Sequence, residues 1–210
     1  SPSYSPFSFT AFPLKERCSI TQVADASPIP TMVYNFPGVT GGLDLDSDLI
    51  YTIAQHPNIV GTKLSCGNIG KLHRLTSSLP SSQFAVFSGR SDTFVHGLNA
   101  GSAGLISALV NIAPRVHVKT WEEWKAGGEE RERAMERQAM LGQADWACSK
   151  IGGIGGIKTF VSENWGYGTG QVRAPLKVAS PEGIRAKAKE YNVLVTLKDL
   201  EVKLSSATNQ

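Results

Sequence analysis

The sequence lacks any apolar run close to the ~20 residues that cross a bilayer. It also lacks a basic block: the net charge of +3 is spread along the chain, which argues against a nucleic-acid groove or a membrane-surface patch. Cysteine is scarce and odd in number, with only Cys18, Cys66 and Cys148, so neither a disulfide framework nor a zinc site is expected. The four histidines show no paired ligand spacing, and no metal site is predicted. These absences favour a globular protein of a reducing compartment, with the cytoplasm expected and the mitochondrion open.

Short apolar segments alternate with amphipathic ones between residues 30 and 115. The segments that resemble buried strands are residues 31–36, 59–64, 84–87 and 104–108. Between them, helical periodicity appears at 46–55, where Asp46 or Ser47 can cap the first turn, near Ile69 to Leu75, and around Phe94. A repeat of roughly 25 residues with strands that are apolar throughout predicts βαβ units and a parallel sheet. The alternatives are an open doubly wound sheet and a closed (β/α)8 barrel.

Beyond residue 115 the pattern becomes helical. We therefore predict strand-and-helix units over 1–115, a helical region over 116–204, and a polar, disordered tail over 205–210.

Lys63 lies inside an apolar strand, near the strand's C-terminal end. Burying an ammonium is costly, whereas a desolvated, neutral lysine can attack a ketone and form a Schiff base. The alternative is a strand-end lysine whose amine reaches solvent or pairs with an acid. Tyr34 takes the equivalent place on the preceding strand. Its phenol could move protons beside such a lysine, or it could be a core tyrosine whose hydroxyl is satisfied at the rim.

Five segments, in order along the chain, resemble the dihydrodipicolinate synthase and N-acetylneuraminate lyase family, the pyruvate-dependent class I aldolases. They are YNFPGVTGG, HPNIVGTKLSCGN, FAVFSGRSD, GSAGLISALVNIAP and GIKTFVSENWGYGTGQVRAPL. The resemblance implies the C-terminal half of a (β/α)8 TIM barrel, about strands 5–8, followed by a helical segment. Ser1-Pro2-Ser3-Tyr4 resembles the end of the family's fourth strand.

By the resemblance, Lys63 forms the imine and Tyr34 carries protons. Tyr4 joins the proton relay, in a neighbouring subunit's site. Gly89 lines the substrate pocket, and the backbone carbonyl of Ile106 contributes to it. Arg90, Ser91 and Asp92 follow Gly89, at the rim where barrel enzymes vary their specificity.

The sequence also departs from the family. Strands one to three are absent, and so is the Gly-Thr/Ser-Thr-Gly-Glu segment that binds the substrate carboxylate. We therefore expect this chain alone to bind pyruvate weakly and to form the imine slowly. The first eighteen residues, rich in Ser, Phe and Pro, also fit a transit peptide.

The resemblance implies a carbon–carbon lyase that needs no cofactor beyond the covalent Schiff base. The amino-acid sequence of these segments most resembles that of fungal aldolases that split 2-keto-3-deoxy sugar acids into pyruvate and glyceraldehyde. The alternatives are 4-hydroxy-2-oxoglutarate aldolase, dihydrodipicolinate synthase, and a truncated, non-catalytic family member. The expected partners are a small 2-oxo acid, an aldehyde, and further copies of the chain in a homodimer or homotetramer.

Overall fold

The computed structural model describes residues 12–207. The chain folds as two compact units, which are treated separately below. Unit 1 comprises residues 1–87 and 100–103, and unit 2 comprises 88–99 and 104–210. This division differs from the predicted boundary at residue 115, because the segment after the third strand packs with the helical region. Phe94 and Leu98, for example, share one apolar core with Leu141.

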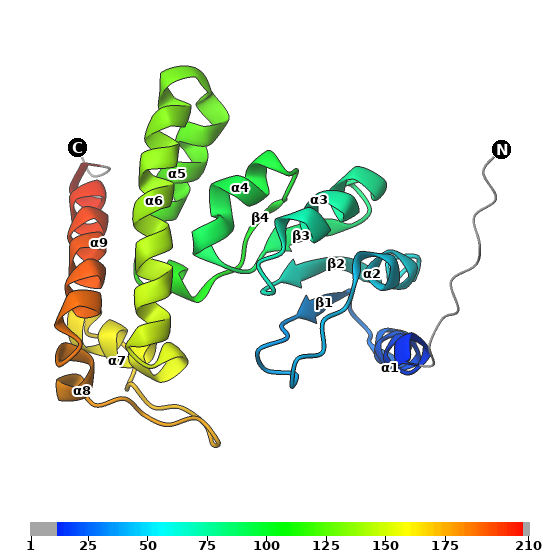
Figure 1. The fold of residues 1–210 in the computed structure, drawn as a ribbon, viewed down its shortest axis with the longest axis horizontal. Coiled ribbons are helices and arrows are strands. Elements are labelled where there is room, and N and C mark those ends of the chain that lie inside the picture. Colours follow the sequence, from blue (N-terminus) through cyan, green and yellow to red (C-terminus); the bar gives the residue numbers. More distant parts are fainter. Residues whose placement is uncertain (1–11, 208–210) are drawn as a thin grey trace. The chain divides into compact units, whose positions relative to one another are not determined.

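Unit 1 alternates helices and parallel strands (Figure 1). Its elements are α1 (Phe12–Ala26), β1 (Thr31–Asn35), α2 (Ser47–Ile53), β2 (Ile59–Leu64), α3 (Ile69–Ser78) and β3 (Ala85–Ser88). The strands of this unit lie in the order β1-β2-β3, and β1 pairs in parallel with β2. The predicted parallel α/β arrangement is therefore confirmed, with β2 at its predicted bounds.

One face of the β1–β2 pair is covered by helices, and the other is open. Val33 and Leu64 point into a core that α2 and α3 close with Ile50 and Leu72. On β1, the alternate residues Met32 and Tyr34 are exposed. The strands approach one another closely at Gly61, where an added Cβ would lie 2.5 Å from the Ala85 carbonyl oxygen. A side chain at that position would separate β2 from β3.

Polar side chains fix the helix starts and the link from α1 to β1. Asp46 caps α2 by accepting from the Leu49 amide at 2.8 Å, as predicted. Asn58 donates to the carbonyl oxygens of Ala24, Ser27 and Ile29, between α1 and β1. Helix α1 was not predicted, because its β-branched residues and Pro13 give no clear helical period.

Unit 2 begins with two short elements and continues as a helical assembly. Its elements are η1 (Ser91–Thr93), α4 (Phe94–Asn99), β4 (Gly104–Leu105), η2 (Ala108–Asn111), α5 (Pro114–Ala126), α6 (Gly128–Lys150), α7 (Gly153–Trp165), α8 (Pro181–Arg185) and α9 (Ala188–Ala207). Helix α6 packs against α5 and α9, and the three run side by side in Figure 1. Leu109, Leu141, Phe160 and Leu197 are buried in the shared core.

Two expectations about unit 2 are corrected. The fourth strand covers only Gly104–Leu105 rather than 104–108, because the chain turns into η2 after Ser107. Residues 205–207 belong to α9 and are not disordered, since Leu200 and Leu204 still pack on the core near the helix end. None of the helices among residues 12–207 is long and apolar enough to span a membrane.

Candidate active site

Lys63 and Tyr34 are register partners on the parallel strands β2 and β1. The Lys63 Nζ atom lies 4.2 Å from the centroid of the Tyr34 ring, a distance typical of a cation–π contact. Lys63 is half-buried, and Tyr34 keeps 51% of its surface exposed. The structure thus places an amine beside a phenol on the face of the strand pair that the helices leave open.

Ser65 is a neighbour of this pair that sequence reasoning missed. Its Oγ atom lies 3.5 Å from the Tyr34 hydroxyl, and its amide donates to the Asn35 carbonyl oxygen at 2.9 Å. Its position two residues after Lys63, at the end of the strand, could have identified it from the sequence as a neighbour of the pair.

Among the side chains of unit 1 that the structure describes, Lys71 on α3 is fully buried and Lys63 is not. Its side chain is 3% exposed, and its amine donates to the Asp44 carboxylate and, at 2.6 Å, to the Leu45 carbonyl oxygen. Asp44 also accepts from the Asn35 side-chain amide at 2.7 Å, while Asn35 Oδ1 accepts from the Leu45 amide at 3.1 Å. These contacts define the Asn35–Asp44–Lys71 cluster.

The charge of Lys71 is compensated within this cluster. Partial burial pushes the pKa of the Asp44 carboxyl up, but the hydrogen bonds from Lys71 and Asn35 and the Lys71 charge outweigh it, so the pKa is lowered. The amine of Lys71 is therefore held by an ionised acid at neutral pH, which does not suit a nucleophile.

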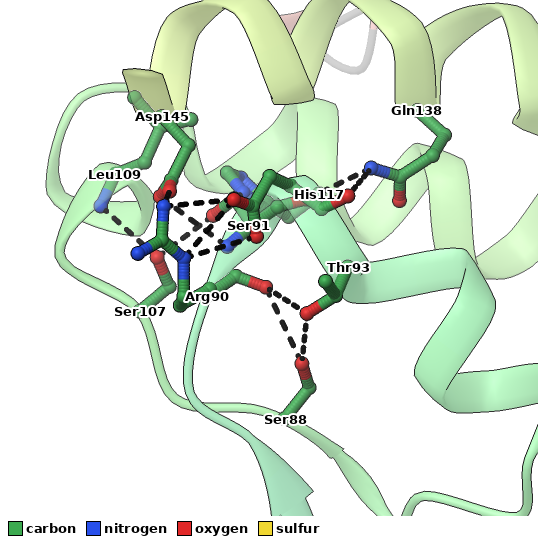
Figure 2. A network of polar contacts seen from close by, with 10 residues as sticks. Ser88, Arg90, Ser91, Thr93, Ser107, Leu109, His117, Gln138 and Asp145 are labelled. Carbon is green, nitrogen blue, oxygen red and sulfur yellow. Dashed lines mark hydrogen bonds and ion pairs between the residues drawn. The ribbon is translucent and has the colours of Figure 1, made fainter. Parts of the chain in front are cut away.

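The loop after β3 in unit 2 is held by an internal polar network (Figure 2). Arg90 pairs with Asp92 at 2.8 Å and with Asp145 of α6 at 3.1 Å. Burial and the neighbouring Asp92 charge raise the pKa of Asp145, and Arg90 opposes this without cancelling it. The Arg90 guanidinium is thus already shared between two carboxylates.

Ser91 is fully buried within the same network. Its Oγ atom lies 2.8 Å from Ser107 Oγ and 2.9 Å from His117 Nε2 (Figure 2). His117 Nδ1 donates to the Ala113 carbonyl oxygen at 2.7 Å, since a carbonyl can only accept. Burial lowers the pKa of His117, and the Ala113 contact and the Glu201 charge oppose it only in part.

Gln138 on α6 completes the support of this loop. Its amide donates to the carbonyl oxygens of Ser91 at 3.0 Å and Asp92 at 2.9 Å, and its Oε1 accepts from the Val95 amide at 2.7 Å. One buried side chain thereby satisfies three backbone groups of the loop.

The contacts in unit 2 bear on the predicted substrate-binding residues. The polar groups of Arg90, Ser91 and Asp92 form ion pairs and hydrogen bonds inside the network. These contacts do not support direct contact of the three residues with a substrate. Gly89 is half-buried, and Ile106 is partly exposed, with its amide donating to the Ser88 carbonyl oxygen at 2.9 Å. Their roles remain predictions. Tyr4 lies outside the described residues.

Known proteins with similar sequences include fungal aldolases. The chain is 42% identical over 176 residues to the "Probable 4-hydroxy-2-oxoglutarate aldolase, mitochondrial" of Emericella nidulans, covering 84% of this chain and 55% of that protein. It is 41% identical over 177 residues to the L-threo-3-deoxy-hexylosonate aldolase of Hypocrea jecorina, covering 78% of this chain and 55% of that protein. The chain therefore spans about half the length of these relatives.

Solved structures of the same family have a similar fold. A dihydrodipicolinate synthase family protein of Coccidioides immitis matches with a TM-score of 0.75 and 33% identity, over 95% of this chain and 63% of that one. The chloride-inhibited dihydrodipicolinate synthase of Acinetobacter baumannii, solved with pyruvate, matches with a TM-score of 0.72 and 25% identity, over 86% of this chain and 62% of that one. The shared architecture is part of a TIM barrel with its C-terminal helices. The Dihydrodipicolinate synthetase family model matches residues 10–192, and the chain belongs to this family.

Proposed function

We propose that this chain carries the imine-forming centre of a class I aldolase, in which Lys63 bonds to pyruvate or to a 2-oxo acid that yields pyruvate. The observation that carries the proposal is the Lys63 amine 4.2 Å from the Tyr34 ring at the end of two paired parallel strands. The family membership and the aldolase names of the relatives support it.

The chemistry follows from these two groups. The neutral Lys63 nitrogen attacks the ketone carbon, the carbonyl electrons move to oxygen, and that oxygen takes a proton. Protonation of this hydroxyl releases water, and the nitrogen lone pair forms the carbon–nitrogen double bond of a protonated imine. A base then removes the proton of the substrate hydroxyl two carbons from the imine carbon, an aldehyde leaves, and the electrons of the broken carbon–carbon bond move to the imine nitrogen to give an enamine. Protonation of the enamine carbon and hydrolysis of the imine release pyruvate and restore the amine. Tyr34 is the proposed carrier of these protons.

For the substrate, we propose a 2-keto-3-deoxy sugar acid, with 4-hydroxy-2-oxoglutarate as the second candidate. The two relatives reported above carry one name each at nearly equal identity. The ion pairs of Arg90 support this order. A dicarboxylate needs a free cation for its second acid group, and Arg90 is engaged by Asp92 and Asp145.

The test is borohydride reduction in the presence of saturating pyruvate, followed by peptide mapping. The expected pyruvyl adduct lies on Lys63 and is lost in Lys63→Met. Lys71 is the internal control, because its amine is buried and paired with Asp44. An adduct on Lys71 or Lys158 instead would overturn the assignment. A chain that folds but yields no adduct would support the alternative, a non-catalytic family member.

Further parts of the proposal concern assembly and location. No cofactor is proposed beyond the covalent imine, and homodimers or homotetramers are proposed, to be tested by analytical ultracentrifugation. The proposed location is a reducing compartment, either the cytoplasm or the mitochondrial matrix. The name of the Emericella nidulans relative supports the matrix, and fractionation of cells that produce a tagged protein would decide.

A further inference from the structure

The Asn35–Asp44–Lys71 cluster ties down both ends of the loop between β1 and α2. Asn35 is the last residue of β1, and Asp44 lies just before the start of α2. Between them, residues 36–43 form successive turns in which Gly41 and Gly42 adopt positive φ angles of 67° and 94°. Lys71, from α3, contacts the far end of this loop through Asp44 and Leu45. The loop is therefore closed by side chains rather than by its own backbone.

We propose that Lys71 is a positioning residue for Tyr34, acting through Asp44 and Asn35. This inference rests on the proposed function, because it assigns Lys71 a part in aligning the proton carrier with the imine-forming lysine. Lys71 does not touch the reacting atoms.

Strand geometry connects the cluster to the Tyr34 ring. Successive side chains point to opposite faces of a strand, so a buried Asn35 turns Tyr34 to the open face. Asn35 is 1% exposed and held on two sides, with its side chain bonded to Asp44 and Leu45 and its carbonyl oxygen to the Ser65 amide. These bonds hold Asn35, the residue that follows Tyr34, on the buried face of the strand, and thereby keep the half-exposed Tyr34 ring on the opposite face.

Energetics also favour a role for Lys71 beyond filling space. A buried ion pair often contributes no more stability than a well-packed apolar residue of similar volume, although removing one partner of a fully buried pair is costly. Asp44 remains about half-exposed, with a side-chain exposure of 43%, so water can solvate it when Lys71 is replaced. Lys71→Met should therefore fold. Its main effect should be a less well aligned Tyr34 ring rather than a loss of stability.

The experiment is a double-mutant cycle on the 210-residue chain. The rate of pyruvate trapping on Lys63 is measured in wild type, Lys71→Met, Tyr34→Phe and the double variant. Arg74→Met is the matched control, since Arg74 is also a cation of α3, and its Nε donates to Ser47 at 2.8 Å outside the cluster. Asp44→Asn provides a second way to break the cluster if Lys71→Met fails to fold. Amide exchange at Leu45 and Ser65 follows the loop itself.

We expect Lys71→Met to slow trapping by about 10- to 100-fold, the cost of a misplacement near 1 Å. It should slow trapping little in the Tyr34→Phe background, because the group that it positions is then absent. Arg74→Met should match wild type.

Two outcomes would overturn the inference alone: an equal loss in both backgrounds, which marks a purely structural residue, or no loss in Lys71→Met. Absence of the Lys63 adduct in wild type would instead remove the proposed function, and this role with it.

Discussion

The two units treat polar residues at strand ends in opposite ways. In unit 1, Lys63 and Tyr34 contact each other across paired strands, and within residues 12–207 neither forms an ion pair. In unit 2, the residues after β3 are bound by partners on α5 and α6. Arg90 forms an ion pair with Asp145, and Ser91 forms a hydrogen bond with His117. Within residues 12–207, the same kind of position thus carries groups without an ion pair in one unit and groups bound by several polar partners in the other.

The difference shows that position along a strand is not enough to assign chemistry. The number of partners that the rest of the fold supplies determines whether a polar side chain at a strand end is held in place. Lys63 keeps its amine beside an aromatic ring, whereas Lys71 is held by a carboxylate and a backbone carbonyl. The predictions below test this comparison, first in unit 1 and then in unit 2.

The largest effect is expected from removing the Tyr34 hydroxyl. Tyr34→Phe keeps the ring over Lys63 and deletes only the group proposed to carry protons. Adduct formation should slow by roughly 10²–10⁴-fold while the unfolding free energy changes little, because the side chain is half-exposed. Tyr51→Phe, at an exposed tyrosine on α2, is the control. A wild-type rate in Tyr34→Phe would return the residue to a structural role and erase the contrast between the units.

In unit 2 the largest expected effect is on stability. Gln138→Ala leaves the carbonyl oxygens of Ser91 and Asp92 and the amide of Val95 without their partner. The unfolding free energy should fall by roughly 2–4 kcal/mol, because buried polar groups that lose their partner cost ~1–3 kcal/mol each. Chemical denaturation measures this. Gln143→Ala, exposed on the same helix, should cost almost nothing. Equal effects of the two variants would mean that the network does not hold the loop.

The sequence predicted the frame of both units but not this network. A continuous apolar run identifies β2, and period-3.6 patterns identify α2 and α4, because both reflect burial, which acts residue by residue. The pairing of Tyr34 with Lys63 followed from two adjacent strands of a parallel sheet. By contrast, the contact between Arg90 and Asp145 joins residues 55 positions apart, and no local pattern reports it.

The buried lysine shows the same limit. Lys63 was expected to be the buried one because it lies in an apolar strand, and Lys71 was not predicted to be buried. Lys71 is buried because the loop after β1 folds over it with Asp44, a long-range event that spacing does not encode. Likewise, Ser91 was assigned to substrate because it follows a strand, and its burial is set by α5.

His117 should make the stability of unit 2 sensitive to mild acid. Burial lowers its pKa in the folded protein, so the unfolded chain takes up a proton first, near pH ~6.5. The unfolding free energy should therefore fall as the pH drops below about 6.5, and level off below the folded pKa. His117→Gln should remove this component. His96→Gln, at an exposed histidine of α4, is the control and should retain it. An unchanged pH dependence in His117→Gln would show that the histidine is not buried as described.

The smallest effect is expected for Arg90, and it tests the comparison most directly. The side chain is about one-third exposed, and ion pairs of this kind contribute ~0–1 kcal/mol, so Arg90→Ala should destabilise the chain only slightly. If Arg90 serves the network alone, the half-saturating concentrations for trapping 4-hydroxy-2-oxoglutarate and a 2-keto-3-deoxy sugar acid should change by the same factor. Arg115→Ala, which removes a cation paired with Glu201 elsewhere in unit 2, is the matched control. A selective loss of 4-hydroxy-2-oxoglutarate binding in Arg90→Ala would instead show that the guanidinium leaves Asp145 for the second carboxylate. The ranking of the two substrates would then reverse, and the loop after β3 would be a binding element as well as a structural one.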